Sequence, residues 1–449
     1  MTSESGSTGD GGSTSGVGST GAVTDSGGSS STTAPTSGAT TEAASTGAPA
    51  VCGDGIVAPE EICDDGNDVP EDGCNAQCQK TGAVVWTKSY NGPGDSDEFA
   101  EDVAVGEDGR IVIVGYQVGA MNKYEMLLLV LDPDGNEVWN KVIPGELGLD
   151  AALRSVVLGD DGTIYVAGFD FVDDVTSNAI VRSFAPDGKA GWTFAEQSLD
   201  PGFAVVNDLE FAGGALYSVG QEVLADPGTQ ITVRKHAVGD GAPAWKTTSQ
   251  GGLTWSYGGA VAVTKAGIVV VGGASPSKST NFPLILRLDD KGVAGPPSVD
   301  PKGEPGLWLD VKPIGDAGDV VLAGRFAPPG VTEYDYTVRR IGADGAEQWS
   351  VYQDQDQLFD QANGVSVGPD GSVFTAGLVT KIGENENVYV RSLTGEGDVV
   401  WSSTYNDVDL DLNDVAGAVA HGPDFAVAVG FTLAKGQGAN MWVRRYALD

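Results

Sequence analysis

The sequence predicts an all-β fold, a closed ring of seven similar sheets, because three features recur with one period of about 52 residues. A tryptophan recurs at this period with a single step missing, near Pro297. A glycine that ends a hydrophobic run recurs seven times, and an arginine that precedes the tryptophan position recurs six times. Fixed repeats of this length are typical of propeller blades, so the expected fold class is a seven-bladed β-propeller.

The three series share one register along the chain. The recurring tryptophans are Trp86, Trp139, Trp192, Trp245, Trp349 and Trp401. The recurring glycines are Gly115, Gly168, Gly220, Gly272, Gly324, Gly377 and Gly430. The recurring arginines are Arg182, Arg234, Arg287, Arg339, Arg391 and Arg444, with Leu129 in the first repeat. Three markers in one register leave little room for chance.

Each repeat contains four short strands, as residues 102–143 illustrate. Runs rich in β-branched and aliphatic residues are separated by turn sequences such as the Asp-Pro-Asp-Gly of residues 132–135. Asp-Gly pairs favour tight hairpins because both central residues must reach positive φ. No stretch has a sustained apolar period of 3.6 residues, so almost no helix is expected. The expected strands of this repeat are 102–105, 110–115, 126–131 and 137–142.

The two ends of the chain predict how the ring closes. Residues 442–449 match the third strand of a blade and then stop, whereas residues 82–86 match a fourth strand with no third strand before it. We therefore expect both ends of the chain to build the seventh blade. Such closure leaves no free edge in the ring of sheets.

The repeated tryptophans and arginines are interpreted first as packing residues. The tryptophans lie on the expected fourth strands, where an aromatic ring can pack against the next blade; stacking on a cofactor is the alternative. The arginines alternate with apolar residues such as Ile180 and Phe184. We expect them to pair with aspartates or to lie on aromatic rings between blades, with ligand binding as the alternative.

Two other segments precede the propeller, which is expected over residues 81–449. Residues 1–50 are almost entirely Ser, Thr, Gly and Ala, with no Lys, Arg or aromatic residue. Such a composition cannot bury enough apolar surface to fold, so residues 1–50 are expected to form a disordered tether. Residues 51–80 are expected to form a small cysteine-rich module.

The module holds all four cysteines of the chain and too few apolar residues for a core. Two disulfides are therefore expected, with three pairings open. Zinc is the alternative because four thiolates can bind it, but the usual close pair of cysteines at each end is absent. The many acidic side chains of the module suit hard cations such as calcium better than zinc. The cysteines are Cys52, Cys63, Cys74 and Cys78.

The module also resembles a known family. Residues 52–55 (Cys-Gly-Asp-Gly), 61–67 (Glu-Ile-Cys-Asp-Asp-Gly-Asn) and 71–78 (Glu-Asp-Gly-Cys-Asn-Ala-Gln-Cys) closely resemble the cysteine-rich repeat common in surface proteins of myxobacteria and relatives. Glu71 departs from that pattern, which often has glycine there. The resemblance implies an extracytoplasmic protein, often a lipoprotein. The propeller repeats, as in residues 364–377, resemble bacterial SBBP-type β-propeller repeats, a class with no single activity to carry over.

Charge and cysteine content limit the compartment and the partners. Disulfides imply an oxidising compartment, so an extracellular or cell-surface location is expected. The first residues are not a signal peptide, so we expect an export signal, and with it a lipid anchor, upstream, unless the start is misassigned. No apolar run is long enough to span a membrane. The net charge of −38 disfavours nucleic acid and anionic lipid as partners. A monomer is expected.

An acidic loop is the candidate calcium site. Residues 406–414 alternate carboxylates at strand spacing, and calcium is the cation such oxygen ligands suit. The loop lacks the glycine and the distal glutamate of a calcium-binding helix-loop-helix, and a solvated acidic loop is the alternative. The candidate ligands are Asp407, Asp409 and Asp411. Apart from calcium, no cofactor is expected.

One face of the ring is the more promising for function. The short Asp-Gly turns should lie on one face, and the longer, variable loops that cross between blades should lie on the other. Function usually sits on variable loops held by a rigid scaffold, and aromatic rings beside carboxylates suit sugar or peptide binding. Packing between blades is the alternative role for these rings. The candidate ligand-binding residues are Phe99, Phe203, Trp255, Tyr257, Trp308 and Phe359.

Two function classes remain at this stage. The first is a non-catalytic binding or scaffolding module that engages a protein or a glycan through the variable-loop face. The second is an enzyme that acts on glycans through a carboxylate pair. Only His236 and His421 are available as histidines, and they fall in different blades, with no catalytic motif around them. A quinone-cofactor propeller is a weaker alternative, because residues 131–139 are similar to the Asp-x-x-Gly-x-x-x-Trp core of such repeats.

Overall fold

The computed structural model describes most of the chain from Val51 to Leu448. The described residues are 51–58, 61–67, 69, 72–92, 96–119, 122–198, 201–224, 228–276, 281–299, 303–327, 333–406, 413–434 and 438–448. All of them belong to one compact unit, Pro49–Asp449. They form 28 strands in seven four-stranded antiparallel sheets and no α-helix, which confirms the all-β, seven-bladed propeller.

The first three blades follow the chain in order. Blade 1 contains β2 (Glu98–Val105), β3 (Ile111–Val118), β4 (Tyr124–Leu131) and β5 (Glu137–Ile143). Blade 2 contains β6 (Ala151–Leu158), β7 (Ile164–Phe171), β8 (Ser177–Phe184) and β9 (Ala190–Gln197). Blade 3 contains β10 (Ala204–Ala212), β11 (Ala215–Val223), β12 (Thr229–His236) and β13 (Pro243–Ser249).

The next three blades repeat the pattern. Blade 4 contains β14 (Trp255–Thr264), β15 (Gly267–Ser275), β16 (Phe282–Leu288) and a two-residue β17 (Ser298–Val299). Blade 5 contains β18 (Gly306–Ile314), β19 (Asp319–Phe326), β20 (Asp335–Ile341) and β21 (Glu347–Gln353). Blade 6 contains β22 (Gln361–Val367), β23 (Val373–Thr380), β24 (Glu386–Leu393) and β25 (Val399–Tyr405).

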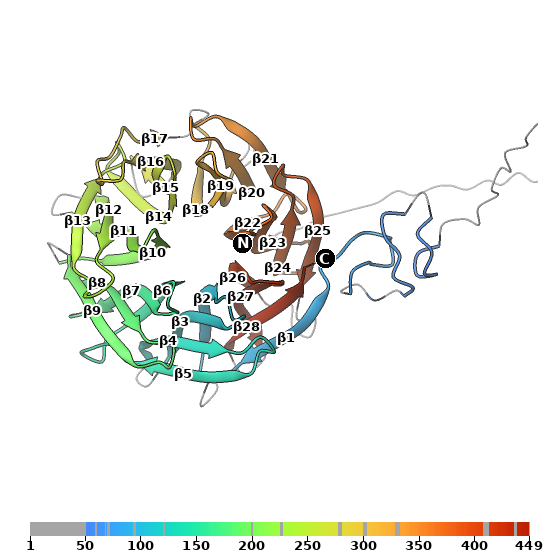
Figure 1. Cartoon of the computed structure of the whole chain (residues 1–449), viewed down its shortest axis with the longest axis horizontal. Coiled ribbons are helices and arrows are strands. Elements are labelled where there is room, and N and C mark those ends of the chain that lie inside the picture. Colours follow the sequence, from blue (N-terminus) through green and yellow to red (C-terminus); the bar gives the residue numbers. More distant parts are fainter. Residues whose placement is uncertain are drawn as a thin grey trace, which may run out of the picture. The chain divides into compact units, whose positions relative to one another are not determined.

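The last blade joins the two ends of the propeller. It contains β26 (Asp414–His421), β27 (Phe425–Ala434), β28 (Gly438–Ala447) and β1 (Val84–Tyr90), in the order β26-β27-β28-β1. Val84 faces Tyr446 in the ladder and Tyr90 faces Met441. Figure 1 shows blue β1 beside red β28 at the rim. The expected closure of the ring by both ends is confirmed.

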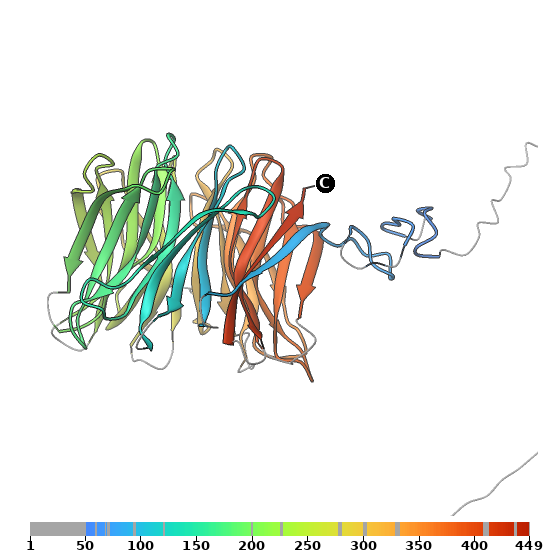
Figure 2. The same cartoon turned by 90° about the horizontal axis from the view of Figure 1, so that it is seen from below.

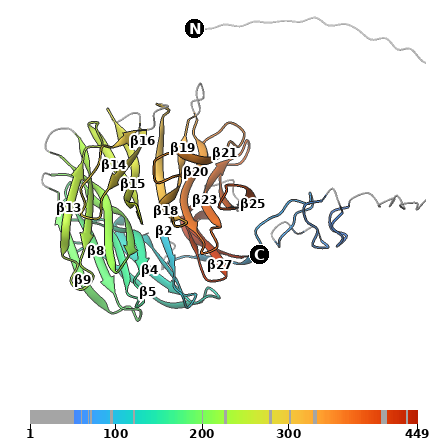
Figure 3. The same cartoon turned by 45° about the horizontal axis from the view of Figure 1, so that its top comes forward.

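In every blade the first strand is innermost and the fourth is at the rim. Figure 1 shows the seven sheets around a common centre, and the tilted view of Figure 3 keeps β2 and β18 towards the middle and β9 and β13 outside. Seen from the side, the strands run between two faces of the ring (Figure 2). The core is a series of layers between adjacent blades, filled by side chains such as Ile113 and Val427. Among the described residues, no helix is long and apolar enough to cross a membrane.

The repeated tryptophans connect each blade to the next one. The indole Nε1 of Trp86 donates to the carbonyl of Pro133, and that of Trp139 donates to Pro186, each over 3.1 Å. The ring lies against the glycine of the same Asp-Gly turn: a Cβ placed on Gly135 would lie 2.9 Å from the Trp86 ring. Only glycine fits there, so the tryptophan and the turn sequence recur together.

The repeated arginines lie between neighbouring strands and blades. Arg234 is 1% exposed, pairs with Glu196 at 2.9 Å and lies over the ring of Phe194. Arg444 lies over the ring of Tyr405, 4.4 Å from its centroid. Both arrangements, pairing with an acid and stacking on a ring, are those the sequence predicts, and both place the guanidinium in a packing role.

The cysteine-rich module is held by the disulfides Cys52–Cys78 and Cys63–Cys74. No cysteine of the chain is free, so the alternative of a four-thiolate zinc site is wrong. The Asp64 carboxylate accepts backbone N–H groups from Gly53, Gly55 and Gly66, among others. At least this carboxylate of the module therefore has a structural role.

Candidate binding site at the mouth of the central channel

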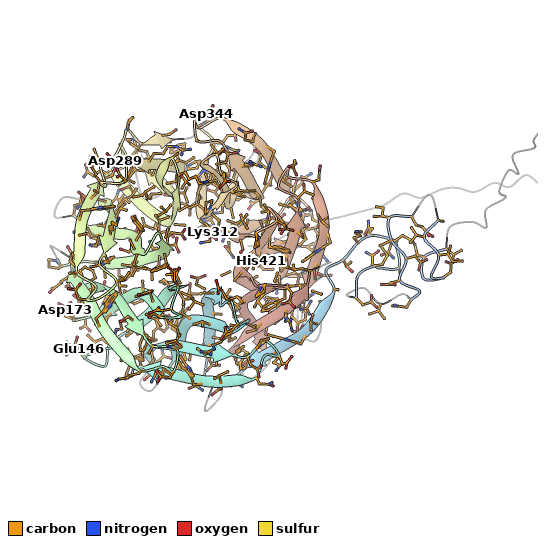
Figure 4. The ribbon with its side chains drawn as sticks, in the orientation of Figure 1. Glu146, Asp173, Asp289, Lys312, Asp344 and His421 are labelled. Atoms are coloured by element: carbon orange, nitrogen blue, oxygen red, sulfur yellow. A yellow bond between two sulfur atoms is a disulfide. The ribbon has the colours of Figure 1, made fainter. Side chains whose placement is uncertain are left out.

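The seven innermost strands enclose a central channel of ≈550 Å³. Its wall takes residues from β2, β6, β10, β14, β18, β22 and β26, so every blade contributes. Figure 4 shows Lys312 and His421 at this centre. The innermost strands begin at the inter-blade loops and end at the Asp-Gly turns, so the channel has a loop-side mouth and a turn-side mouth.

Each innermost strand has a β-bulge near the loop-side mouth. The ladder register shifts once between each first and second strand, as between Ala100 and Asp102. A bulge leaves one residue unpaired and turns its side chain away from the regular pleat. All seven bulged residues line the channel. They are Glu101, Arg154, Asn207, Gly259, Leu309, Asn363 and Gly417.

The bulges also explain why the expected loops were too long. The sequence predicts inter-blade loops that run to Glu101, Asn207, Gly259, Leu309 and Asn363. In the structure the strands begin three to five residues earlier, as β2 does at Glu98. The bulge shifts the alternation of inward and outward side chains by one residue, so the period of two is lost at that point.

The residue after the bulge often bonds to the next blade. Oδ2 of Asp102 accepts the Val156 N–H, and Oδ2 of Asp310 accepts the Val365 N–H, each over 2.8 Å. Ser155 plays the same role for Leu209 over 3.1 Å. These side chains supply acceptors for N–H groups beside the bulges, which would otherwise be buried without partners. They are structural parts of the channel wall.

A part-buried lysine lies among carboxylates further along the channel. Nζ of Lys312 is 3.5 Å from Oδ1 of Asp310. Burial alone would lower the pKa of Lys312, but the carboxylates of Asp310, Asp208, Glu210 and Asp102 raise it overall. Burial raises the pKa of Asp102 to about 7 and that of Glu210 to about 7, with Lys312 opposing both shifts. The lysine therefore stabilises a wall that carries more acid than base.

The loop-side mouth carries a ring of polar groups. Nη1 of Arg154 pairs with Oε2 of Glu101 at 2.8 Å. The amide of Asn207 donates to the carbonyl of Gly258, and that of Asn363 donates to the carbonyl of Ala416, each over 2.8 Å. Tyr257 completes the wall, and burial raises the pKa of its hydroxyl while Arg154 opposes that rise. Fixed amide, guanidinium and phenol groups of this kind can orient a polar ligand.

A second, smaller pocket lies beside the channel. Tyr257 lines both cavities, and Trp255 lines the smaller pocket alone. This pocket has a volume of ≈220 Å³ and lies between blades 3 and 4. Its other lining groups are amides and hydroxyls, including Gln221, Thr229 and Asn281. Because Tyr257 lines both cavities, the pocket and the loop-side mouth are neighbouring parts of one surface.

The other candidate aromatic residues lie near the same face but pack against further rings. Phe99 stacks on Tyr116, with ring centroids 4.9 Å apart. Phe203 packs on Phe169, with centroids 5.1 Å apart. These two and Phe359 are part-buried, so they combine inter-blade packing with some exposure.

Trp308 is different, because it is only 1% exposed. Its ring packs on Phe326, with centroids 4.5 Å apart, and under the guanidinium of Arg339. In this structure it is a core residue of blades 4 and 5 rather than a surface ring. The expected loop position of Trp308 is also corrected, since it lies within β18.

The remaining candidate residues are three aspartates and two histidines. Asp407, Asp409 and Asp411 lie outside the described residues, so calcium binding there stays a prediction. His236 is 1% exposed and its Nε2 hydrogen-bonds Ser218 over 2.9 Å, which is a structural role. His421 lies at the turn-side mouth near Asp370.

Nothing in the sequence pattern selects Arg154, Asn207 or Asn363. Their shared feature is the bulge position, which recurs every 50 to 54 residues but holds five residue types. The bulged residues lie 13 to 15 positions before the recurring glycines, so an alignment on those glycines does not bring them into one column. Only the bulge itself, which no residue type indicates, shows that these positions face the channel.

Comparison with known proteins gives a family match for the cysteine-rich module and several similar solved structures. Residues 49–79 match the family described as Domain of unknown function (DUF4215). No curated protein matches the chain. Similar solved structures include Drosophila Plexin A in complex with Semaphorin 1b, at 9% identity and a TM-score of 0.47, with 83% of this chain and 88% of that chain covered.

Two other solved structures are similar at the same level. A mutant of the Synechocystis apocarotenoid oxygenase has 12% identity and a TM-score of 0.41, with coverage of 68% and 71%. A neuraminidase-like protein of A/little yellow-shouldered bat has 11% identity and a TM-score of 0.40, with coverage of 81% and 99%.

Proposed function

We propose that the protein is an extracytoplasmic, monomeric binding module that holds a glycan or a protein at the loop-side mouth of its propeller. The location rests on the two disulfides, which persist in oxidising compartments. Binding rests on the surface formed by the mouth and the neighbouring pocket. The single observation that carries the proposal is that Tyr257 joins a ring of fixed polar groups to a pocket lined by Trp255.

The physical support is the combination of rigidity and chemistry. Each polar group at the mouth is fixed by a partner within the ring, so a ligand would meet groups that are already ordered. Trp255 and Tyr257 offer aromatic surface next to those groups, which is the composition of sites that bind sugars and polar peptides. The variable inter-blade loops surround the same mouth and give room for specificity.

The test is a binding screen with the full chain against a glycan array and against purified extracytoplasmic proteins. We expect at least one ligand to bind, and the double variant Trp255→Ala, Tyr257→Ala to weaken that binding at least tenfold. Isothermal titration calorimetry gives the dissociation constants. Tyr352→Ala is the matched control. Tyr352 is 45% exposed on the outer strand β21, so this substitution removes an aromatic ring far from the channel.

Thermal unfolding checks that the double variant still folds. Unchanged affinity in a folded double variant would contradict the proposed surface. A chain that binds no glycan and no protein in the screen would contradict the binding function itself.

A further inference from the structure

Arg325 lies near the loop-side face and contacts aromatic rings rather than an acid. It lies in β19, and its guanidinium carbon is 5.1 Å from the ring centroid of Tyr334 and 5.2 Å from that of Phe359. Its Nη1 donates to the side-chain carbonyl of Gln361. The two rings contact each other in a T-shaped arrangement, with centroids 6.3 Å apart, and both border the guanidinium, so its orientation is restricted without an acid.

Among the described residues, no carboxylate pairs with Arg325. Other arginines near the surface do have such partners, including Arg154 with Glu101 and Arg340 with Asp319. Burial lowers the pKa of Arg325, and only the tyrosine hydroxyls of Tyr334 and Tyr257 act against this. Arg325 is thus a half-buried guanidinium without an acidic partner in the described part, although the chain has 63 acidic and only 25 basic residues.

Arg325 belongs to the same surface as the mouth. Burial raises the pKa of the Tyr257 hydroxyl, and the guanidinium groups of Arg154 and Arg325 both oppose this rise, so both lie within electrostatic range of that hydroxyl. Gln361, which accepts from Arg325, donates in turn to Asn363, a channel-lining bulged residue. A chain of polar contacts therefore runs from Arg325 into the channel mouth.

We propose that Arg325 is the anchor of a carboxylate-binding subsite, and that the ligand is an acidic glycan whose hexuronic acid places its carboxylate on this guanidinium. The inference rests on the proposed function and adds the ligand class. Arg binds carboxylates through two parallel hydrogen bonds, which gives both energy and geometry. A ring next to that carboxylate would meet Tyr257 and then Trp255.

A glycan fits this surface better than an acidic peptide. The pocket beside Tyr257 is smaller than the ~300–1,000 Å³ of pockets that take drug-sized ligands, so it suits a single ring. Its amides and hydroxyls, from Gln221, Thr229 and Asn281, match the hydroxyl groups of a sugar. Trp255 adds a flat apolar face.

The acidic surroundings do not prevent anion binding at this position. Remote carboxylates act weakly at physiological salt, where the Debye length is about 8 Å. Two acids on the same side of blades 5 and 6 are buried, since Asp360 is 0% exposed and Asp335 is 7% exposed, whereas Glu333 and Asp354 are exposed to solvent, where screening is strongest. Burial raises the pKa of Asp360 to about 7 and that of Asp335 to about 6, so both carry less negative charge near neutral pH than exposed aspartates do.

The experiment is calorimetric titration of the full chain with oligogalacturonate. Its methyl ester and a neutral galactan oligosaccharide are compared at the same length, and a poly-glutamate peptide tests the other source of carboxylates. We expect oligogalacturonate to bind at least tenfold more tightly than the ester. Arg325→Gln should remove that difference, and Arg325→Lys should keep part of it, because lysine keeps the charge without the fork.

The matched control is Lys265→Gln, which removes one positive charge at an exposed turn on the opposite face. It should leave the binding of oligogalacturonate unchanged. Thermal unfolding confirms that the Arg325 variants are folded. Equal binding of ester and acid, or full binding by folded Arg325→Gln, would overturn the subsite. Equal or tighter binding of poly-glutamate would overturn the glycan class.

The failure of this inference differs from the failure of the proposed function. If uronates bind no better than neutral sugars while another ligand still depends on Trp255 and Tyr257, the subsite is wrong and the binding module stands. If no ligand depends on those two aromatic residues, the proposed function fails as well.

Discussion

At the scale of single residues, carboxylates of the channel wall bond one blade to the next. Asp102, Asp208 and Asp310 follow bulges and accept N–H groups of the next blade, as Oδ2 of Asp208 accepts the Val261 N–H over 2.8 Å. Glu210 lies two residues further along its strand and accepts a backbone hydrogen bond from Val263, which is also in the next blade. Composition could not single out these four acids, because the chain is acidic throughout. Their role depends on where each innermost strand has its bulge.

The buried acids of the channel predict how stability depends on pH. The pKa of Glu210 is about 7 in the folded chain, above its ordinary value of 4.5, so the folded state binds this proton more tightly than the unfolded state. Its contribution to stability is therefore present below pH 4.5 and lost as the pH rises through about 7. Glu210→Gln removes this loss. We expect the variant to gain free energy of unfolding over wild type at pH 8 and little at pH 5, measured by urea unfolding.

Lys312→Met tests the same cluster by removing the cation instead of a carboxylate, and it is measured by the same urea unfolding. The variant removes a cation that favours the ionised form of four neighbouring carboxylates. These belong to Asp310, Asp208, Glu210 and Asp102. The variant should be less stable than wild type, and the deficit should be larger at pH 8 than at pH 5. If Glu210→Gln and Lys312→Met both keep the pH dependence of wild type, the assignment of these raised pKa values to the channel is wrong.

At the scale of elements, the sequence predicts strands and their order well but places their starts badly. Trp and Asp-Gly recur together because a ring on one blade rests on the turn glycine of the next, so both markers reflect one contact. The starts of β2, β10 and β14 could not be predicted, since the bulge interrupts the alternation that marks a strand. The candidate ligand residues therefore were assigned to loops, whereas Trp255 and Tyr257 belong to β14.

Blade 4 lacks the recurring tryptophan, so the contact between the tryptophan ring and the turn glycine of the next blade is missing there. No tryptophan occupies position 297, and the outer strand β17 keeps only two residues. A Cβ placed on Gly345, in the corresponding turn of blade 5, would have nothing within 4 Å. The turn sequence persists there without the ring that elsewhere covers it, so the Asp-Gly pair is also set by the hairpin itself.

The tryptophan contact predicts a difference between two otherwise similar substitutions. Trp139→Phe removes a hydrogen bond from Nε1 to the Pro186 carbonyl and should lower the free energy of unfolding by about 1 kcal/mol. Trp245 occupies the same position in blade 3, but its buried Nε1 has no hydrogen-bond partner. Trp245→Phe should therefore be neutral or slightly stabilising. Urea unfolding of both variants measures the free energies of unfolding. An equal loss of free energy in the two variants would show that the size of the ring, and not the hydrogen bond, determines how much the tryptophan stabilises the fold.

At the scale of the whole molecule, ring closure couples the two ends of the chain. The match of residues 442–449 to a third strand and of residues 82–86 to a fourth was visible in the sequence, because both ends keep the register of complete repeats. The binding surface was not visible in the sequence. Residues from seven blades form the mouth, and no local sequence pattern shows that they come together. Arg325 and Tyr257 come together only because blades 4 and 5 are neighbours in the ring.

Closure by β1 predicts that a short deletion has a large effect. A chain that begins at Asn91 lacks β1 and leaves the N–H and C=O groups of β28 without partners along Met441–Tyr446. An exposed edge strand of this length pairs with other chains, so we expect a lower thermal unfolding midpoint and association in size-exclusion chromatography with light scattering. A chain that begins at Thr81 is the matched control: it loses the tether and the cysteine-rich module but keeps β1, and it should stay monomeric with an unfolding midpoint close to that of the full chain. Equal behaviour of the two shortened chains would mean that the seventh blade does not need its fourth strand.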